Sequence, residues 1–330
     1  MNHSVALAEA ARSIRGSVQV ALACHVSPDG DALGSMLGMH HVLRHHGIAS
    51  VASFSEPFVV AAHYRELPGL ELMVPPAQFP QNPDVMITFD CGSLARLGDL
   101  QGPALAAREL IVIDHHISND RYGSINVIDD RAAASGVVVR ELVRTLGFSL
   151  DRDAAVCLYA ALVCDTGRFQ YASTTPEVFE LAHELVQFDV PIPTLSRTLF
   201  EEHRFAYLQL MASALQRAEL VAHERFVSTI VTQEDLAKFD VTMDEVEGLI
   251  DVIRRAREAE VTAVLKEEAD GLVRVSLRSL GEVDVCAIAQ ALGGGGHKFA
   301  AGFTAPGPSE EIVRQLRSAV AAARRVSTAS

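Results

Sequence analysis

The sequence predicts an α/β fold, with a parallel sheet covered by helices on both faces in an N-terminal domain and a smaller α/β domain after it. Three observations predict this arrangement. Short apolar runs alternate with helix-length amphipathic stretches through the first half of the chain, as in βαβ units. Pro191 and Pro193 then interrupt the chain, since two prolines this close fit neither a helix interior nor a sheet interior. Beyond them, strand-like and helical stretches follow in a different order.

The length of 330 residues agrees with this division, because domains commonly hold about 100–200 residues. We expect a first domain over residues 1–188, a linker with a connecting helix over 189–222, and a second domain over 223–330. Hydrophobic residues make up 49% of the chain and charged residues 21%, which is ordinary for a globular protein that buries a full core.

The sequence carries no sign of a membrane or a secreted protein. No apolar run reaches the ~18 residues that a membrane span needs, and the N-terminus lacks the basic and then apolar layout of a signal peptide. The five cysteines stand singly, mostly within apolar runs, which favours buried free thiols over disulfides. We therefore expect a cytoplasmic protein with no membrane partner.

The net charge of −14 limits the class of nucleic acid that the chain can bind. Tight binding of long duplex DNA requires many lysine and arginine contacts to phosphates, so the charge argues against it. A small anionic substrate is compatible with an acidic protein, because bound divalent cations dominate the field at their own site.

The first strand-like run, 18–24, is followed by a turn that carries His25, Asp29 and Asp31. A proline and a glycine break regular structure in this turn, and a helical pattern follows over 32–46. Two carboxylates so close on a turn can face points about 3.5–4 Å apart, the separation of two-metal sites. Oxygen ligands with imidazole suit manganese or magnesium. The alternative is structural, with Asp31 capping the helix and Asp29 holding the turn.

Two further apolar runs end in residues of the same kinds. These are Asp90 after 85–89, and Asp114, His115 and His116 after 110–113. Because open α/β sheets bind ligands at the carboxyl ends of their strands, we expect these side chains to converge at one sheet edge. Asp165 follows a helical pattern over 151–163 and is a fourth candidate position.

The remaining elements are predicted from the same patterns. In the first half we expect further strands at 48–54 and 71–74 and helices at 135–146 and 176–188, followed by a long amphipathic stretch over 194–222. In the second domain we expect strands at 226–231, 261–266 and 272–277, and helices at 245–256, 283–292 and 310–325. The glycine run 293–296 on its own is typical of a flexible loop.

Taken together, these motifs resemble the DHH phosphoesterase superfamily, named for the triplet that stands here at residues 114–116. The stretch 293–298, with Ala-Ala-Gly at 300–302, resembles the DHHA1 domain that follows the DHH domain in that superfamily. The resemblance covers almost the whole chain. It is closest to the short bacterial subgroup of nanoRNases, which are oligoribonucleases with pAp phosphatase activity. The sequence is also similar to actinobacterial members that act on cyclic di-AMP or its linear product.

The resemblance implies two Mn²⁺ ions, with Mg²⁺ or Co²⁺ as substitutes, and a role for each ligand. The first ion would be bound by His25 and Asp29, the second by Asp31, His115 and Asp165, and Asp90 would bridge the two. In two-metal sites the ions activate a water for attack on phosphorus and stabilise both the attacking and the leaving oxygen.

Three residues form the catalytic group that the resemblance implies: Asp90, Asp114 and His116. Asp114 would orient the histidines by hydrogen bonding, which fixes their tautomers. His116 would face the substrate phosphate and neutralise charge or protonate the leaving oxygen.

In the second domain, the resemblance implies a set of substrate-binding residues: Arg278, Ser279, Gly294, Gly295, Gly296 and His297. Glycines have no Cβ, so their backbone N–H groups can approach a phosphate or a base closely. An arginine suits a terminal phosphate because its guanidinium binds two oxygens at once. The alternative for Arg278 is an ordinary surface charge.

The function implied is that of a manganese-dependent phosphodiesterase and exonuclease, with its active site in the cleft between the two domains. Its partners would be short oligoribonucleotides and adenine nucleotides, which it cuts to mononucleotides, with conversion of pAp to AMP and hydrolysis of cyclic di-AMP. A homodimer is also implied. Two alternatives stay open, a family-II-like inorganic pyrophosphatase, which shares the metal motifs, and a non-catalytic cyclic-dinucleotide sensor.

Overall fold

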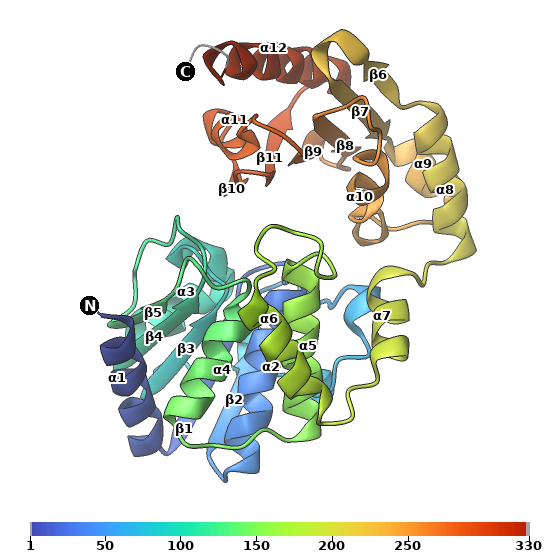
Figure 1. Cartoon of the computed structure of the whole chain (residues 1–330). Helices are drawn as coiled ribbons and strands as arrows, with labels where there is room; N and C mark the ends of the chain where they lie inside the picture. The colour runs from blue at the N-terminus through green and yellow to red at the C-terminus, as the bar shows by residue number, and fades with distance from the viewer. Residues whose placement is uncertain (1, 328–330) are drawn as a thin grey trace. The chain divides into compact units, whose positions relative to one another are not determined.

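The computed structural model describes residues 2–327. Backbone contacts divide the chain into two units, Met1–Glu202 and His203–Ser330 (Figure 1). Each unit has its own sheet and its own clusters of buried apolar side chains. Within the described residues, we find no helix with both the length and the apolar character needed to cross a membrane.

The first unit contains a five-stranded, fully parallel sheet in the order β2-β1-β3-β4-β5, which confirms the predicted parallel sheet. Its strands are β1 (Gln19–Cys24), β2 (Ala49–Ser53), β3 (Val85–Phe89), β4 (Glu109–Asp114) and β5 (Ile125–Ile128). The central strands β1, β3 and β4 are almost entirely buried, as expected for runs of apolar residues covered on both faces.

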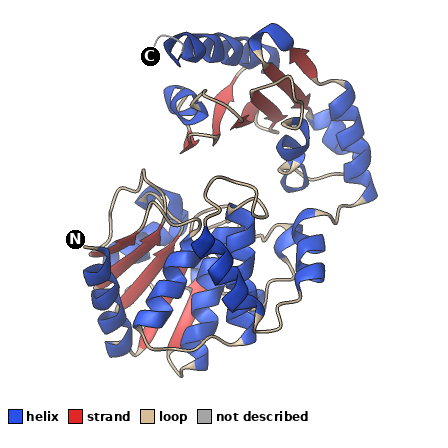
Figure 2. Cartoon of the chain, viewed as in Figure 1, coloured by secondary structure: helices blue, strands red, loops and turns tan. Residues whose placement is uncertain are grey.

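Helices cover both faces of this sheet (Figure 2). Alternate side chains of β1 lie on opposite faces of the sheet, so Val20 and Leu22 belong to one apolar cluster and Ala21 and Ala23 to the other. The larger cluster is completed by α1 (His3–Gly16), α2 (Gly30–His45), α4 (Ser135–Thr145), α5 (Arg152–Asp165), α6 (Pro176–Val186) and α7 (Ile192–Phe200). The smaller cluster is completed by Phe79, which follows η3 (Pro76–Gln78), and by residues of η4 (Leu94–Leu100) and α3 (Gln101–Ala106).

Glycines bring α2 and α5 unusually close together. A Cβ on Gly34 would lie 2.4 Å from the carbonyl oxygen of Cys157, and a Cβ on Gly30 would lie 2.2 Å from the sulfur of Cys164. Only glycine therefore fits at these points of contact. The packing is antiparallel, so the beginning of α2 lies beside the end of α5, where Asp165 is the last helical residue.

Two sequence predictions are wrong in detail. Residues 71–74 do not form a strand, because the segment follows Gly69 in a left-handed conformation (φ 93°) and forms the short 3₁₀ helix η2 (Leu70–Leu72). The stretch 194–222 is not one amphipathic helix. The polar residues 201–204 separate α7 from α8 (Phe205–Gln216), and the strand β6 (Glu219–Val221) follows.

The second unit has a six-stranded sheet in the order β10-β11-β9-β8-β7-β6, antiparallel except for the pair β7–β8. Its longer strands are β7 (Phe226–Val231), β8 (Val261–Glu267), β9 (Leu272–Ser279) and β11 (Ala300–Pro306), with β10 (Gly295–His297) at one edge. One face packs on α11 (Val285–Ala291) and α12 (Ser309–Ser327), and the other on α8, α9 (Gln233–Phe239) and α10 (Leu249–Ile253). The predicted smaller α/β domain is confirmed.

Candidate metal centre

Histidines and aspartates from four segments of the first unit meet at the carboxyl ends of its strands. The segments are the turn after β1, the residues after β3, the residues at the end of β4, and the last residue of α5. In parallel sheets this edge collects residues that are distant in sequence, because each strand ends there. All six first-unit residues predicted as metal ligands are brought together, namely His25, Asp29, Asp31, Asp90, His115 and Asp165.

The imidazole of His25 is oriented by its own backbone. Its Nδ1 lies 2.8 Å from the carbonyl oxygen of Val26, which favours a proton on Nδ1 and leaves the Nε2 lone pair for another partner. Nε2 lies 3.5 Å from Asp90 Oδ2 and 3.9 Å from Asp29 Oδ2. This ring is buried, so its orientation is well defined by packing.

His115 repeats this arrangement from the end of β4. Its Nδ1 lies 3.1 Å from the carbonyl oxygen of Ala132, while Nε2 faces three carboxylates. Nε2 is 3.0 Å from Asp165 Oδ2, 3.6 Å from Asp90 Oδ1 and 3.8 Å from Asp31 Oδ2. Both histidines therefore turn the same type of nitrogen toward the aspartates, as metal-binding histidines do when a backbone carbonyl holds the other nitrogen.

Asp29 and Asp31 are held by different groups, and the capping role falls to Asp29. Asp29 Oδ1 accepts hydrogen bonds from the backbone of Asp31 and Ala32 at the N-terminus of α2. Asp31 is fully buried and accepts from the backbone N–H groups at the start of α4 and from the Ser35 hydroxyl. The structural alternative thus describes Asp29 in part, because this residue holds the turn and also caps α2, although its Oδ2 still faces His25. It is wrong for Asp31, which does not cap α2.

Asp90 lies at the centre of the cluster. It follows β3 in a left-handed conformation (φ 52°), and its backbone N–H donates to the carbonyl oxygen of Ile113 in β4. Its two oxygens face in two directions, with Oδ2 toward His25 and Oδ1 toward His115 and His116. A backbone conformation that is unfavourable for aspartate is typical of functional positions, where the surrounding structure enforces it.

Burial and mutual repulsion act on the acidity of these carboxylates. Burial and then the charge of Asp90 raise the pKa of Asp31 well above its ordinary value. Burial also raises the pKa of Asp165 to about 6, although the hydrogen bond with His115 opposes this change. For Asp90, burial is outweighed by the hydrogen bond from His25 and by the charges of the neighbouring histidines, so its pKa is lowered.

The histidines respond by binding protons more tightly. Burial would lower the pKa of His115, but its hydrogen bond to Asp165 and the surrounding carboxylates raise that pKa to about 11. The same balance raises the pKa of His25 beside Asp90. The clustered carboxylates repel one another, and protons held on the neighbouring imidazoles reduce this repulsion. Divalent cations can supply the same positive charge in place of the protons.

The donor atoms suit such cations. Within the described residues of the first unit, three groups have ligand atoms all within 4.8 Å of one another: His25 with Asp29 and Asp90, Asp31 with Asp90 and His115, and Asp90 with Asp114 and His116. Asp90 belongs to all three groups. Carboxylate oxygen and imidazole nitrogen are donors for divalent ions such as Mn²⁺ and Mg²⁺, so the residues present fit a divalent metal centre.

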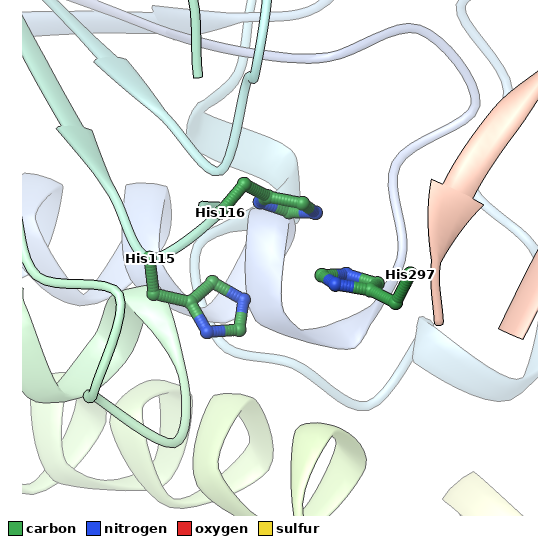
Figure 3. A group of neighbouring side chains, drawn as sticks. All are labelled: His115, His116 and His297. Atoms are coloured by element: carbon green, nitrogen blue, oxygen red, sulfur yellow. The ribbon is translucent and has the colours of Figure 1, made fainter. Parts of the chain in front are cut away.

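Asp114 holds His116, as the resemblance implies. Asp114 Oδ1 accepts from the backbone N–H groups of His115 and His116 and lies 2.7 Å from His116 Nδ1. Its other oxygen accepts from the side-chain amide of Asn119. Figure 3 shows the two adjacent imidazoles at the end of β4. Burial would lower the pKa of His116, but the hydrogen bond to Asp114 together with the charges of Asp90 and Asp114 outweighs burial and raises that pKa.

The predicted substrate residues of the second unit lie at the end of β9, in β10 and directly before β10. The predicted glycine run does not form a loop throughout, because residues 295–297 make β10, which pairs with β11. Gly294 is required by this packing, since a Cβ there would lie 2.1 Å from the carbonyl oxygen of Gly302. His297 is exposed at the end of β10, and the half-buried Arg278 lies near the end of β9 beside the buried Ser279.

Four residues of the centre carry no sequence signal: Ser35, Arg96, Asn119 and Ser135. Arg96 and Ser135 make contacts across 71 and 45 residues of the chain. Ser35 and Asn119 lie only four and five residues from the aspartates to which they donate. Arg96 places Nη2 3.0 Å from His25 Nδ1, and a guanidinium only donates, so this contact favours the tautomer opposite to the one that Val26 favours. A metal ion at Nε2 of His25 would select the tautomer with the proton on Nδ1.

Comparison with known proteins identifies the two domains. The chain matches the DHH family, N-terminal domain, over residues 19–162 and the DHHA1 domain over residues 224–326. It is 31% identical to the bifunctional oligoribonuclease and PAP phosphatase NrnA of Thermus thermophilus, over 91% of this chain and 88% of that protein. It is 28% identical to the protein of the same name from Bacillus subtilis, over 84% of this chain and 86% of that one.

The fold is also found in a solved structure. An exopolyphosphatase-related protein from Bacteroides fragilis has a TM-score of 0.91 to this chain, with 22% identity, and the match covers 98% of this chain and 97% of that one. The likeness extends over the residues of both units, and the two NrnA relatives named above are phosphoesterases by their names. From its two matched domains and its NrnA relatives, we conclude that the chain belongs to the DHH/DHHA1 phosphoesterase superfamily, in the bacterial subgroup that contains the NrnA proteins.

Proposed function

We propose that this chain is a two-metal phosphodiesterase and phosphatase that hydrolyses short oligoribonucleotides to mononucleotides and converts pAp to AMP, with cyclic di-AMP as a further substrate. The observation that carries the proposal is the convergence of two histidines and four aspartates around Asp90 at the carboxyl edge of the sheet. The substrates are those named for the NrnA relatives, extended to cyclic di-AMP by the sequence resemblance.

The ligands divide into two sets that share Asp90. One set consists of His25, Asp29 and Asp90, and the other of Asp31, Asp90, His115 and Asp165. Two divalent cations supply an activated water and neutralise charge on the phosphoryl oxygens. The mixed oxygen and nitrogen donors favour Mn²⁺, with Mg²⁺ or Co²⁺ as substitutes.

His116 acts on the substrate in this proposal. Asp114 holds its Nδ1–H, so Nε2 is the nitrogen that meets a phosphate or a leaving oxygen. Because Asp114 favours the imidazolium, His116 can donate a proton to the leaving oxygen or stabilise negative charge on the phosphate.

The second unit supplies substrate recognition. We propose that Arg278 binds a terminal phosphate of the substrate, with the buried Ser279 supporting the end of β9. We further propose that Gly294, Gly295 and Gly296, which have no Cβ, let a nucleotide approach their backbone closely, and that the exposed His297 contacts it. The N–H of Gly294 itself donates to the carbonyl oxygen of Ala289. Acidic overall charge favours short oligonucleotides over long ones.

A cytoplasmic homodimer is part of the proposal, and light scattering of the purified protein tests the dimer.

A substrate panel tests the function. The purified protein with Mn²⁺ is offered pApA, a five-nucleotide RNA, pAp, cyclic di-AMP, pyrophosphate and a long single strand, and each assay is repeated with Asp90→Ala and His116→Ala. We expect turnover of the short nucleotides by the wild type and its loss in both variants.

Other results of the panel contradict the proposal in distinct ways. Turnover of pyrophosphate alone makes the chain a pyrophosphatase. Binding of cyclic di-AMP without turnover of any compound makes it a sensor. Turnover that is unchanged in Asp90→Ala removes the metal centre from the reaction.

A further inference from the structure

The beginning of α4 contacts two of the central carboxylates at once. The backbone N–H of Ser135 lies 2.6 Å from Asp31 Oδ2, and that of Gly136 lies 3.0 Å from Asp31 Oδ1. The Ser135 hydroxyl donates to Asp90 Oδ1 over 3.0 Å. Ser135 is completely buried, so water does not compete for these hydrogen bonds.

These donors are available because α4 has no cap of its own. The first N–H groups of a helix lack partners inside the helix, and the residue before this one, Ala134, has no side-chain acceptor. Asp31 fills the role from α2 and gains the favourable field of the helix N-terminus. Gly136 permits the approach, since a Cβ there would lie 2.8 Å from the Cβ of Ala161 and 3.6 Å from Asp31 Oδ1.

The rotation of the Asp90 carboxylate decides which groups its oxygens face. Oδ2 is 3.5 Å from Nε2 of His25, and Oδ1 is 3.6 Å from Nε2 of His115. The last side-chain torsion of an aspartate has a broad energy minimum, so packing alone defines the orientation of its carboxylate only loosely. A hydroxyl that donates to Oδ1 fixes this torsion and directs one oxygen toward each histidine.

We propose that Ser135 is a positioning residue whose hydroxyl sets Asp90 so that each carboxylate oxygen serves one metal position. This inference rests on the ligand role given to Asp90 in the proposed function. The bond from the Ser135 backbone to Asp31 survives a side-chain substitution, so a change at this position isolates the effect on Asp90.

The test compares Ser135→Ala with Ser53→Ala. The Ser53 hydroxyl is also fully buried, but it donates to the backbone carbonyl oxygens of Val74 (2.7 Å) and Phe54 (3.3 Å) instead of to a carboxylate. Titration calorimetry of the metal-free proteins gives the affinity for Mn²⁺, and denaturant unfolding in EDTA gives the stability. We expect Ser135→Ala to bind Mn²⁺ about 10- to 100-fold more weakly, and Ser53→Ala to bind it like the wild type.

A second pair separates the hydroxyl from the shape of the side chain. Ser135→Thr and Ser135→Val have the same shape and differ only in the hydroxyl, so they serve if the alanine variant does not fold. The threonine variant should bind Mn²⁺ about 10- to 100-fold more tightly than the valine variant. Equal affinities within this pair, or wild-type affinity in Ser135→Ala, overturn the inference.

The inference and the proposed function fail in different ways. If the wild type binds Mn²⁺, Ser135→Ala binds it more weakly and no nucleotide of the panel is hydrolysed, the positioning role stands and the proposed function is wrong. If the nucleotides are hydrolysed and Ser135→Ala has both wild-type affinity and wild-type kcat, the positioning role is wrong and the function stands.

Discussion

Among single residues, Asp29 combines a structural contact with a chemical one. Its Oδ1 accepts two backbone hydrogen bonds at the start of α2, and its Oδ2 lies 3.9 Å from His25 Nε2. The first contact needs only an oxygen acceptor, whereas metal binding needs the negative charge. Two substitutions therefore separate the roles.

Asp29→Asn keeps the helix cap and removes the charge. We expect its free energy of unfolding in EDTA to match that of the wild type, and its Mn²⁺-dependent hydrolysis of pApA to fall about 10-fold or more, as for the loss of a metal-site contact. Asp29→Ala should lose the same activity and also about 1 kcal/mol of stability, the usual effect of removing an N-cap. Denaturant unfolding and steady-state kinetics measure the two effects, and full activity in Asp29→Asn contradicts the ligand role.

Asp114 gives a second prediction at this scale. One of its oxygens receives three donors and the other receives Asn119, so an amide in its place must turn an NH₂ group toward another donor. We expect Asp114→Asn to lower kcat on pApA about 10- to 100-fold, because His116 is no longer held in one tautomer. Asp120→Asn changes an exposed carboxyl nearby and should leave kcat unchanged.

At the scale of elements, the contact between α2 and α5 leaves no room for side chains. Gly34→Ala places a methyl group 2.4 Å from the carbonyl oxygen of Cys157, a backbone atom that cannot move without shifting α5. We expect destabilisation of about 1–3 kcal/mol or more by overpacking. Gly16→Ala at the end of α1 meets nothing within 4 Å and should be close to neutral, so thermal unfolding of the two variants tests the contact.

His40 makes α2 sensitive to acid. It is buried, with Nδ1 2.8 Å from the Ser50 hydroxyl, and burial together with the charges of His41 and Arg44 lowers its pKa to about 4. The unfolded chain binds a proton near pH 6.5 and the folded chain does not, so stability is complete above that pH and falls as the pH decreases toward 4.

Between pH 7 and pH 5 this single group should remove about 2 kcal/mol of stability. His40→Gln cannot be protonated, so its stability should change less over the same interval, by about that amount. Urea unfolding of both proteins at the two pH values measures the difference. Parallel pH dependence of the two proteins would mean that His40 is protonated in the folded state.

At this scale the sequence predicts well the elements that depend on neighbouring residues only. The runs before Asp90 and Asp114 are continuous and apolar, which predicts the two strands and places these aspartates at the strand ends. The contacts of Ser135 with Asp31 and Asp90 cross 104 and 45 residues and arise from an uncapped helix, which leaves no trace in the pattern. The segment 71–74 was mispredicted because apolar residues beside Gly69 can form a 3₁₀ turn as easily as a strand.

For the whole molecule, the two units have separate hydrophobic clusters, and the six residues that we propose as metal ligands all belong to the first unit. A ligand stabilises only the part that binds it, by about 2.7 kcal/mol at a concentration 100 times its Kd. We therefore expect calorimetry to resolve two transitions, of which Mn²⁺ raises one and leaves the other in place.

Core substitutions assign these transitions. Leu277 is fully buried in β9, so Leu277→Ala should lower the transition that Mn²⁺ does not move, by a destabilisation of about 2–5 kcal/mol. Leu22→Ala in β1 should lower the other transition. One transition that responds to both substitutions and to Mn²⁺ would show that the units unfold as a single cooperative system.

The strand order of the first sheet has a consequence for synthesis on the ribosome. β1 is made early but lies between β2 and β3, so one of its edges stays open until residue 89 has emerged. The cluster closes only with Asp165, 140 residues after His25 (165 − 25). At roughly 5–20 residues per second, the nascent chain carries an incomplete centre for on the order of ten seconds. In the proposed function the first ligand set is complete at Asp90, whereas the second can bind its ion only after Asp165 has emerged. Binding of the second ion would therefore stabilise a finished first unit instead of nucleating its folding.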